Sequence, residues 1–296
     1  MKLVGLSPQH IRPAMTLKQI LKSVTPPVIW RLLKYARRKA MRSVDCLTYA
    51  PHGWATKLPK STGNEDAWAQ YFPYALEDDR RECESAIRRF RDGQPLLIEQ
   101  NNSADAAQYV VNMPCVYVLA LTARLGPALR ILDYGGNLAT LYWIGKTLLP
   151  GVELEYHCRE LASVAEEGRK ISPEVIWHTD DDCFAERYDV VMFTSVLQYI
   201  QNWQDLLRRA APAVGTYLFL SHVPTVEHVP SYVAMQRAKG MTLLHQQLNR
   251  ADVLAIVQST GLRLVREFVM REHEPIENAP EQPSHRGWLF ERYAGD

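Results

Sequence analysis

The stretch Ile131-Leu132-Asp133-Tyr134-Gly135-Gly136-Asn137-Leu138-Ala139-Thr140 decides the fold. A short apolar run ends in an aspartate, two glycines follow, and a segment typical of a helix comes next. This order is typical of a strand, a tight turn and a helix N-terminus, where backbone N–H groups can bind a ligand. Gly135 and Gly136 allow the backbone to turn sharply and to approach such a ligand closely.

Around this stretch, apolar runs of strand length alternate with helical segments. The apolar runs are 129–132, 152–158, 175–178, 188–194, 216–221, 262–269 and 288–292. The helical segments between them are 138–149, 163–171, 203–211 and 250–259. The alternation predicts an α/β, Rossmann-like, three-layer sandwich, because parallel strands need helical crossover connections. No helix separates the last two runs, so we expect a seven-stranded, mostly parallel sheet with an antiparallel last strand.

The N-terminal part of the chain differs in its sequence pattern from the alternating strands and helices that follow. Helical segments are expected at 16–21, 28–42, 65–69, 77–92 and 104–125. We therefore expect two domains, residues 1–110 as a helical cap on the substrate side and residues 111–296 as the Rossmann-like domain. Segment 28–42 has a basic face, which occurs in helices that contact a membrane surface but more often is the solvated face of a helix packed on its own domain.

Composition narrows the class of partner. The formal net charge of +1 offers no global attraction to nucleic acid, and no apolar run reaches the ~18 residues of a membrane span. The five cysteines are scattered, which predicts free thiols in a reducing cytoplasm and no metal site. The N-terminal helices could pair two subunits as a homodimer, but the sequence does not set the oligomeric state.

Acidic residues follow the second and third strand runs. Glu160 is placed to accept hydrogen bonds from both hydroxyls of a ribose, and Asp180, Asp181 or Asp182 to meet the exocyclic amine of an adenine. Simpler interpretations stay open: Asp133 could cap the following helix, Glu160 could be an acid at a helix start, and the three aspartates could form a solvated turn.

The segment Tyr188-Asp189-Val190-Val191-Met192-Phe193-Thr194-Ser195-Val196-Leu197-Gln198-Tyr199-Ile200 adds to this order of features. Together with the Asp-x-Gly-Gly turn and the closing Arg286-Gly287-Trp288-Leu289-Phe290, it resembles the class I S-adenosylmethionine-dependent methyltransferases. More narrowly, the chain resembles a family of bacterial methyltransferases associated with polysaccharide or small-metabolite gene clusters. Asn137 and Ala139 stand where the superfamily often has glycines, and Asn tolerates a left-handed backbone better than most residues.

The resemblance implies S-adenosyl-L-methionine as the cofactor and a role for each site residue. The methionine end would be lined by Asp133, Gly135, Gly136 and Asn137, the ribose held by Glu160, the adenine met by Asp180, and the floor beside the sulfonium formed by Ser195, Val196 and Gln198.

The expected reaction is methyl transfer to oxygen or nitrogen of a small-molecule acceptor. His222 follows the fifth strand run, and we expect it to act as a general base or to orient the acceptor. Residues 223–247 are expected to form an insertion that covers the acceptor. Two alternatives stay open: a non-catalytic binding protein that kept the fold, and an NAD-linked oxidoreductase, although the fingerprint G-x-G-x-x-G is missing.

Overall fold

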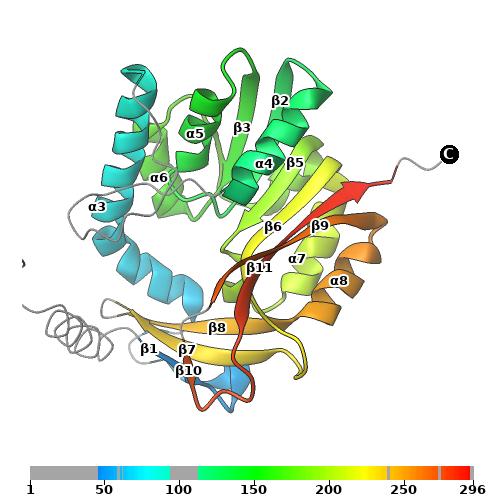
Figure 1. The fold of residues 1–296 in the computed structure, drawn as a ribbon. Coiled ribbons are helices and arrows are strands. Elements are labelled where there is room, and N and C mark those ends of the chain that lie inside the picture. Colours follow the sequence, from blue (N-terminus) through cyan, green and yellow to red (C-terminus); the bar gives the residue numbers. More distant parts are fainter. Residues whose placement is uncertain are drawn as a thin grey trace, which may run out of the picture. The chain divides into compact units, whose positions relative to one another are not determined.

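A computed structural model describes residues 46–58, 61, 63–93, 113–238, 241–272 and 275–293 (Figure 1). Residues Cys46–Asp296 form one compact unit. The helices expected at 16–21 and 28–42, and the first part of the one expected at 104–125, lie outside the described residues. In the part of the chain that is described, no helix is long and apolar enough to cross a membrane.

The main sheet has the strand order β4-β3-β2-β5-β6-β11-β9. Its strands are β2 (Ala128–Tyr134), β3 (Glu153–Arg159), β4 (Ile176–His178), β5 (Tyr188–Thr194), β6 (Val214–Val226), β9 (Leu262–Glu272) and β11 (Ser284–Arg292). The first five strands of this order are mutually parallel, and β11 runs antiparallel between β6 and β9. The parallel part follows the doubly wound order 3-2-1-4-5, so the predicted fold class is confirmed.

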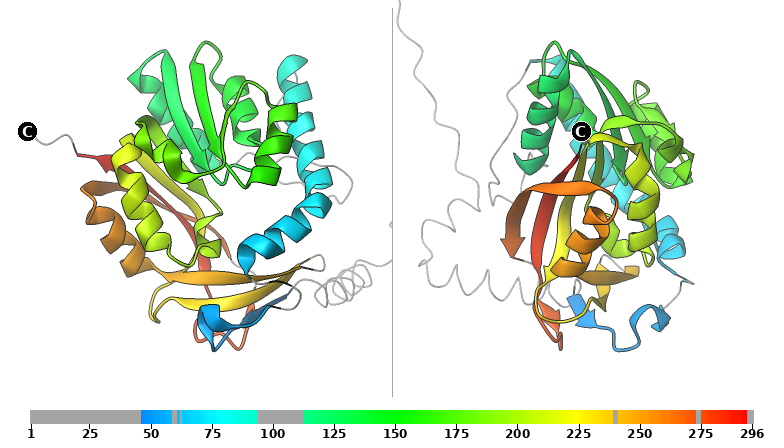
Figure 2. Two further views of the ribbon diagram at one scale, coloured as in Figure 1. Left: turned by 180° about the vertical axis from the view of Figure 1, so that it is seen from behind. Right: turned by 90° about the vertical axis from the view of Figure 1, so that its right-hand side faces the viewer.

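Helices cover both faces of this sheet, which makes three layers. One face packs against α3 (Asn64–Arg91), α4 (Met113–Thr122), α5 (Thr140–Leu148) and α6 (Ala162–Ile171), and the other against α7 (Trp203–Ala210) and α8 (Arg250–Gln258). Figure 2 shows α7 and α8 from behind, in yellow-green and orange. Successive residues of β5 alternate between the two cores, with Val190 and Met192 in one and Val191 and Phe193 in the other.

A second sheet extends the first and differs from the sequence prediction. It contains β10 (Ile276–Glu277), β1 (Cys46–Tyr49), β7 (Tyr232–Ala238) and β8 (Met241–Asn249) in that order. Strand β8 joins the main sheet by pairing with the end of β6. Part of the N-terminal region is therefore a strand, and residues 223–247 are largely extended, because these strands bury Leu47, Val226 and Ala234 in a small core of their own.

Helix α3 is a single helix where the sequence predicts two, at 65–69 and 77–92. Pro73 lies within it and cannot donate an intrahelical hydrogen bond, a common cause of bending. Figure 1 shows α3 bent, with one part beside β8 and the other beside α5 and α6. Contacts with all three elements hold it together across the proline.

Five single-turn 3₁₀ helices complete the described elements. They are η1 (Gly53–Ala55), η2 (Ala123–Leu125), η3 (Asp181–Ala185), η4 (Leu197–Tyr199) and η5 (Ala211–Ala213). Two of them, η3 and η4, directly follow strands β4 and β5, so they stand at the edge of the sheet where α/β proteins bind ligands.

Replacing Gly168 in α6 by alanine should destabilise the protein although alanine favours helices. A Cβ at this position would lie 2.3 Å from Cη2 of Trp177, so the core must shift, at a typical cost of about 1–3 kcal/mol. We expect urea unfolding to give a lower free energy of unfolding for Gly168→Ala. The exposed Glu166→Ala on the same helix should stay within about 0.5 kcal/mol of wild type. An equally stable Gly168→Ala would contradict the packing described here.

Candidate functional site

A cavity of about 1530 Å³ opens at the carboxyl ends of β2, β3 and β5. Its lining includes five of the nine residues predicted to bind the cofactor, namely Gly135, Asn137, Glu160, Ser195 and Val196. The other four, Asp133, Gly136, Asp180 and Gln198, do not line it. The structure thus brings the turn after β2, the acid after β3 and the segment after β5 to one place.

The two glycines of the turn leave no room for side chains. Gly135 has a φ of +77°, and a Cβ there would lie 2.7 Å from Cγ2 of Val196. At Gly136, a Cβ would lie 2.4 Å from Oδ2 of Asp133 and 2.8 Å from Sγ of Cys158. Gly135 therefore allows a tight turn at the cavity wall, whereas Gly136 allows the turn to pack on the strands.

The next residues of the turn adopt left-handed conformations without being glycines. Asn137 has a φ of 54° and Ala139 a φ of 57°. The Asn137 side chain also forms a hydrogen bond to α3, in which its Nδ2 donates to Oδ2 of Asp79 at 3.0 Å. The turn thus keeps a glycine-like backbone and gains a link to α3.

The Glu160 carboxylate in the cavity wall is held by two backbone N–H groups. Its Oε1 accepts the backbone N–H of Asn137 and its Oε2 that of Leu161, both at 2.9 Å. Its own backbone N–H donates to the carbonyl of His178 at 3.0 Å. Burial raises the pKa of Glu160, against the lowering effect of these two backbone hydrogen bonds to the carboxylate. Each carboxylate oxygen keeps a further lone pair for a ligand hydroxyl.

Asp133 is fully buried against the glycine turn. Tyr156 donates its hydroxyl to Oδ2 at 2.6 Å, and Oδ1 has no hydrogen-bond partner among the described residues. Burial raises the pKa of Asp133 to about 7, although the Tyr156 hydrogen bond acts the other way. A buried carboxylate oxygen without a donor costs free energy, which a bound cationic or N–H group would relieve.

After β4, Asp181 lines the cavity and Asp180 does not. Asp180 caps η3, accepting the backbone N–H of Asp182 at 3.2 Å. Asp181 accepts the hydroxyl of Tyr134 at 3.0 Å and forms ion pairs with Arg159 at 3.2 Å and Arg209 at 2.7 Å. These contacts fix the Asp181 carboxylate at the wall.

After β5, Ser195 is held in a left-handed conformation, with φ 56°, and its N–H donates to the carbonyl of Ser221 at 2.8 Å. Gln198 lies behind it, 1% exposed, and donates from Nε2 to Oγ of Ser195 at 3.1 Å. His222 is not among the lining residues. Its Nδ1 lies 3.0 Å from Oγ of Ser221, and its ring is tilted by 60° to that of His285, with the ring centroids 6.2 Å apart.

Residues from α3, η1, η4 and β8 line the other end of the cavity. The aromatic and aliphatic side chains at this end are Trp54, Leu58, Trp68, Tyr199, Ile200 and Leu244. Trp68 meets Tyr199 edge to face, with ring centroids 5.4 Å apart. Trp54 is held in place, since its Nε1 donates to Oε1 of Gln246 at 3.3 Å.

The Asn64 side chain joins three elements at this end. Its Nδ2 donates to the carbonyls of Leu244 at 2.7 Å and Tyr199 at 3.0 Å, and its Oδ1 accepts the N–H of Leu244 at 2.8 Å. The first turn of α3 is thereby attached to β8 and η4.

Three cavity residues were missed by the sequence reasoning. Asp79 and Asn64 lie on α3, more than 40 residues before the turn, and no local pattern connects them with it. Arg159 directly precedes Glu160, and its guanidinium lies 4.7 Å from the ring centroid of Tyr134. A basic residue beside the predicted ribose acid was the signal that could have indicated it.

Comparisons with known proteins identify no family. No family model matches, and no curated protein matches. Among solved structures, magnesium protoporphyrin IX methyltransferase from Synechocystis PCC 6803 is 14% identical to this chain, with a TM-score of 0.48. The aligned region covers 79% of this chain and 100% of the Synechocystis chain. The 1,6-didemethyltoxoflavin-N1-methyltransferase of Burkholderia thailandensis is 13% identical, with a TM-score of 0.44, covering 80% and 93%. At these values the likeness assigns no activity to this chain.

Replacing Asp133 by asparagine should change how stability depends on pH. Burial raises the pKa of Asp133 in the folded protein to about 7, above its ordinary value of 3.8, so this group stabilises the fold at low pH, and that contribution is lost as pH rises toward 7. Asp133→Asn should therefore be more stable than wild type at pH 8, by about 2–4 kcal/mol, and similar to it near pH 4. Urea unfolding at both pH values checks this, and a difference that does not vary with pH would contradict it.

Proposed function

We propose that this protein is an S-adenosylmethionine-dependent methyltransferase that methylates oxygen or nitrogen of a small molecule. The observation that carries the proposal is the Glu160 carboxylate, held beside the glycine turn at the carboxyl ends of β2 and β3. An acid at this point of a doubly wound sheet suits the two hydroxyls of a ribose, and its charge disfavours a 2′-phosphate.

The residues present fit such a cofactor. Oδ1 of Asn137, which lines the cavity, is buried without a hydrogen-bond partner among the described residues, as expected of a group that awaits a ligand. The methionine part carries an ammonium group and a sulfonium beside its carboxylate, and the Asp79 carboxylate in the cavity wall offers negative charge to the two positive groups. Gly135 keeps the wall free of side chains where the ligand would approach.

At the nucleoside end, Glu160 would hold the ribose. Asp181, rather than the predicted Asp180, would stand beside the adenine, since Asp181 lines the cavity and Asp180 caps η3. Ser195 and Val196 would form the floor, with Gln198 fixing the Ser195 hydroxyl from behind.

When bound, S-adenosylmethionine supplies a methyl group on an already activated leaving group. The protein's task is then to position the acceptor and to keep water out. The cavity exceeds the roughly 300–1,000 Å³ of a typical single-ligand pocket, which leaves room for an acceptor between Trp54, Trp68 and Tyr199. A proton-accepting role for His222 stays a prediction, as does a cytoplasmic location.

Isothermal titration with S-adenosylhomocysteine tests the proposal directly. Wild type should bind it, and Glu160→Gln should bind about 10- to 100-fold more weakly, because a charge-assisted hydrogen bond to the ribose is lost. The exposed Asp182→Asn, outside the cavity lining, serves as the matched control and should bind like wild type.

Thermal melting without ligand must accompany this titration, since Glu160→Gln also loses one backbone contact of the turn. Heat released on adding NAD, with none on adding S-adenosylhomocysteine, would overturn the proposal in favour of an oxidoreductase. Binding without a 14-dalton mass gain on any candidate metabolite would favour a non-catalytic binding protein.

A further inference from the structure

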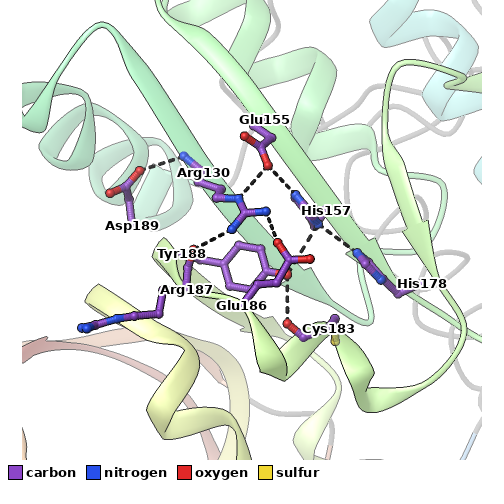
Figure 3. A network of polar contacts seen from close by, with 9 residues as sticks. All are labelled: Arg130, Glu155, His157, His178, Cys183, Glu186, Arg187, Tyr188 and Asp189. Atoms are coloured by element: carbon purple, nitrogen blue, oxygen red, sulfur yellow. Dashed lines mark hydrogen bonds and ion pairs between the residues drawn. The ribbon is translucent and has the colours of Figure 1, made fainter.

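A pair of histidines lies on the neighbouring strands β3 and β4 (Figure 3). Nδ1 of His157 in β3 and Nε2 of His178 in β4 are 2.9 Å apart, with their rings nearly parallel. Nε2 of His157 lies 2.9 Å from Oε1 of Glu155, which also accepts from Nε of Arg130 at 2.6 Å. His157 is 3% exposed, so its ring is buried, whereas the Glu155 side chain that it contacts is 49% exposed.

The number of protons on the two imidazole rings decides whether His157 and His178 can form a hydrogen bond. A carboxylate only accepts hydrogen bonds, so Glu155 requires a proton on Nε2 of His157. In neutral His157, Nδ1 is then an acceptor, and Nε2 of His178 must donate to it. When one extra proton enters, the donor and acceptor can exchange roles. When both rings are protonated, two donors face each other at 2.9 Å and the hydrogen bond is lost.

The same network is attached to the cofactor end of the cavity. The carbonyl of His178 accepts the backbone N–H of Glu160 at 3.0 Å. Tyr188, whose hydroxyl lies 3.5 Å from Nδ1 of His157, donates to the carbonyl of Cys183 within η3 at 2.9 Å. Arg130 also pairs with Glu186, just after η3, which is the helix that presents Asp181. The histidine pair therefore joins the main-chain supports of Glu160 and Asp181.

We propose that His178 is a positioning residue for cofactor binding, and that a second proton on the pair weakens this binding by releasing the end of β4. The inference rests on the proposed function, since it concerns the same cofactor site. His178 does not line the cavity and acts through Glu160 and η3.

The direction of the pH effect follows from the surroundings of His178. The charged and titratable groups that face it from the packed elements are Arg130, Glu155, His157, Arg159, Asp180, Glu186 and Tyr188. Burial lowers the pKa of His178 below its ordinary value of 6.5, and the charge of His157 lowers it further. The hydrogen bond between His157 and His178 is therefore intact at neutral pH. As the pH falls below 6.5 toward the lowered pKa of His178, this hydrogen bond is lost, and its contribution to cofactor binding is lost with it.

The test compares three proteins by titration with S-adenosylhomocysteine, one pH unit above and one below 6.5. His178→Gln keeps an N–H donor for His157 but cannot titrate, and His178→Ala removes the donor. At the higher pH, His178→Gln should bind within about twofold of wild type and His178→Ala about fivefold more weakly. On acidification, wild type should lose about threefold more affinity than His178→Gln.

Glu160 and Asp133 also titrate, but they do so in all three proteins, so the difference between wild type and His178→Gln isolates His178. His228→Gln, an exposed histidine outside the network, should keep the wild-type pH dependence. As a second readout, imidazole ¹H–¹⁵N spectra of the ligand-free protein should show a proton on Nε2 of His178 at the higher pH.

Equal pH dependence of wild type and His178→Gln, with binding intact, would overturn this role and leave the proposed function standing. If His178→Ala bound S-adenosylhomocysteine as tightly as wild type at the higher pH, that result would also overturn the positioning role and leave the proposed function standing. Failure of wild type to bind S-adenosylhomocysteine at either pH would overturn the proposed function, and the positioning role with it.

Discussion

The cavity depends on one buried carboxylate that is bound from two sides. Glu160 receives one backbone N–H from the turn after β2 and one from the start of α6. Because a buried carboxylate is costly without such partners, the turn and the helix must close around it. The glycines at 135 and 136 make that closure sterically feasible. A single acidic side chain thus connects the turn after β2 with the start of α6 at the cavity wall.

The main sheet could be predicted from sequence because each of its elements carries its own local pattern. Apolar runs and helical segments predict each element of this sheet, although β6 extends to Val226 beyond the predicted end at 221, and β11 begins at Ser284 before the predicted start at 288. The second sheet lacks such a pattern. Strand β1 has four residues and β10 two, which is too short for a period to show. Strand β8 buries His245, Gln246 and Gln247 in succession, which hides the alternation of a strand.

At the site, position along the chain could be predicted but side-chain direction could not. The turn and Glu160 follow from where strands end. The choice between Asp180 and Asp181 depends on η3, in which the first aspartate becomes the cap and the second faces the cavity. Asn137 and Ala139 show a related effect, since both adopt a left-handed backbone that costs about 1–2 kcal/mol in a residue other than glycine. Such strain persists only where surrounding contacts impose it, and the Asp79 link is one of them.

The Asn64 amide has a consequence beyond the cavity. Leu244 offers its N–H and C=O on the side of β8 that faces away from β7, and Asn64 satisfies both, much as a neighbouring strand would. Bare strand edges are templates on which other chains can add. One polar side chain therefore replaces a neighbouring strand at Leu244, and the residue that shapes one end of the binding pocket also leaves no free backbone group there for another chain to pair with.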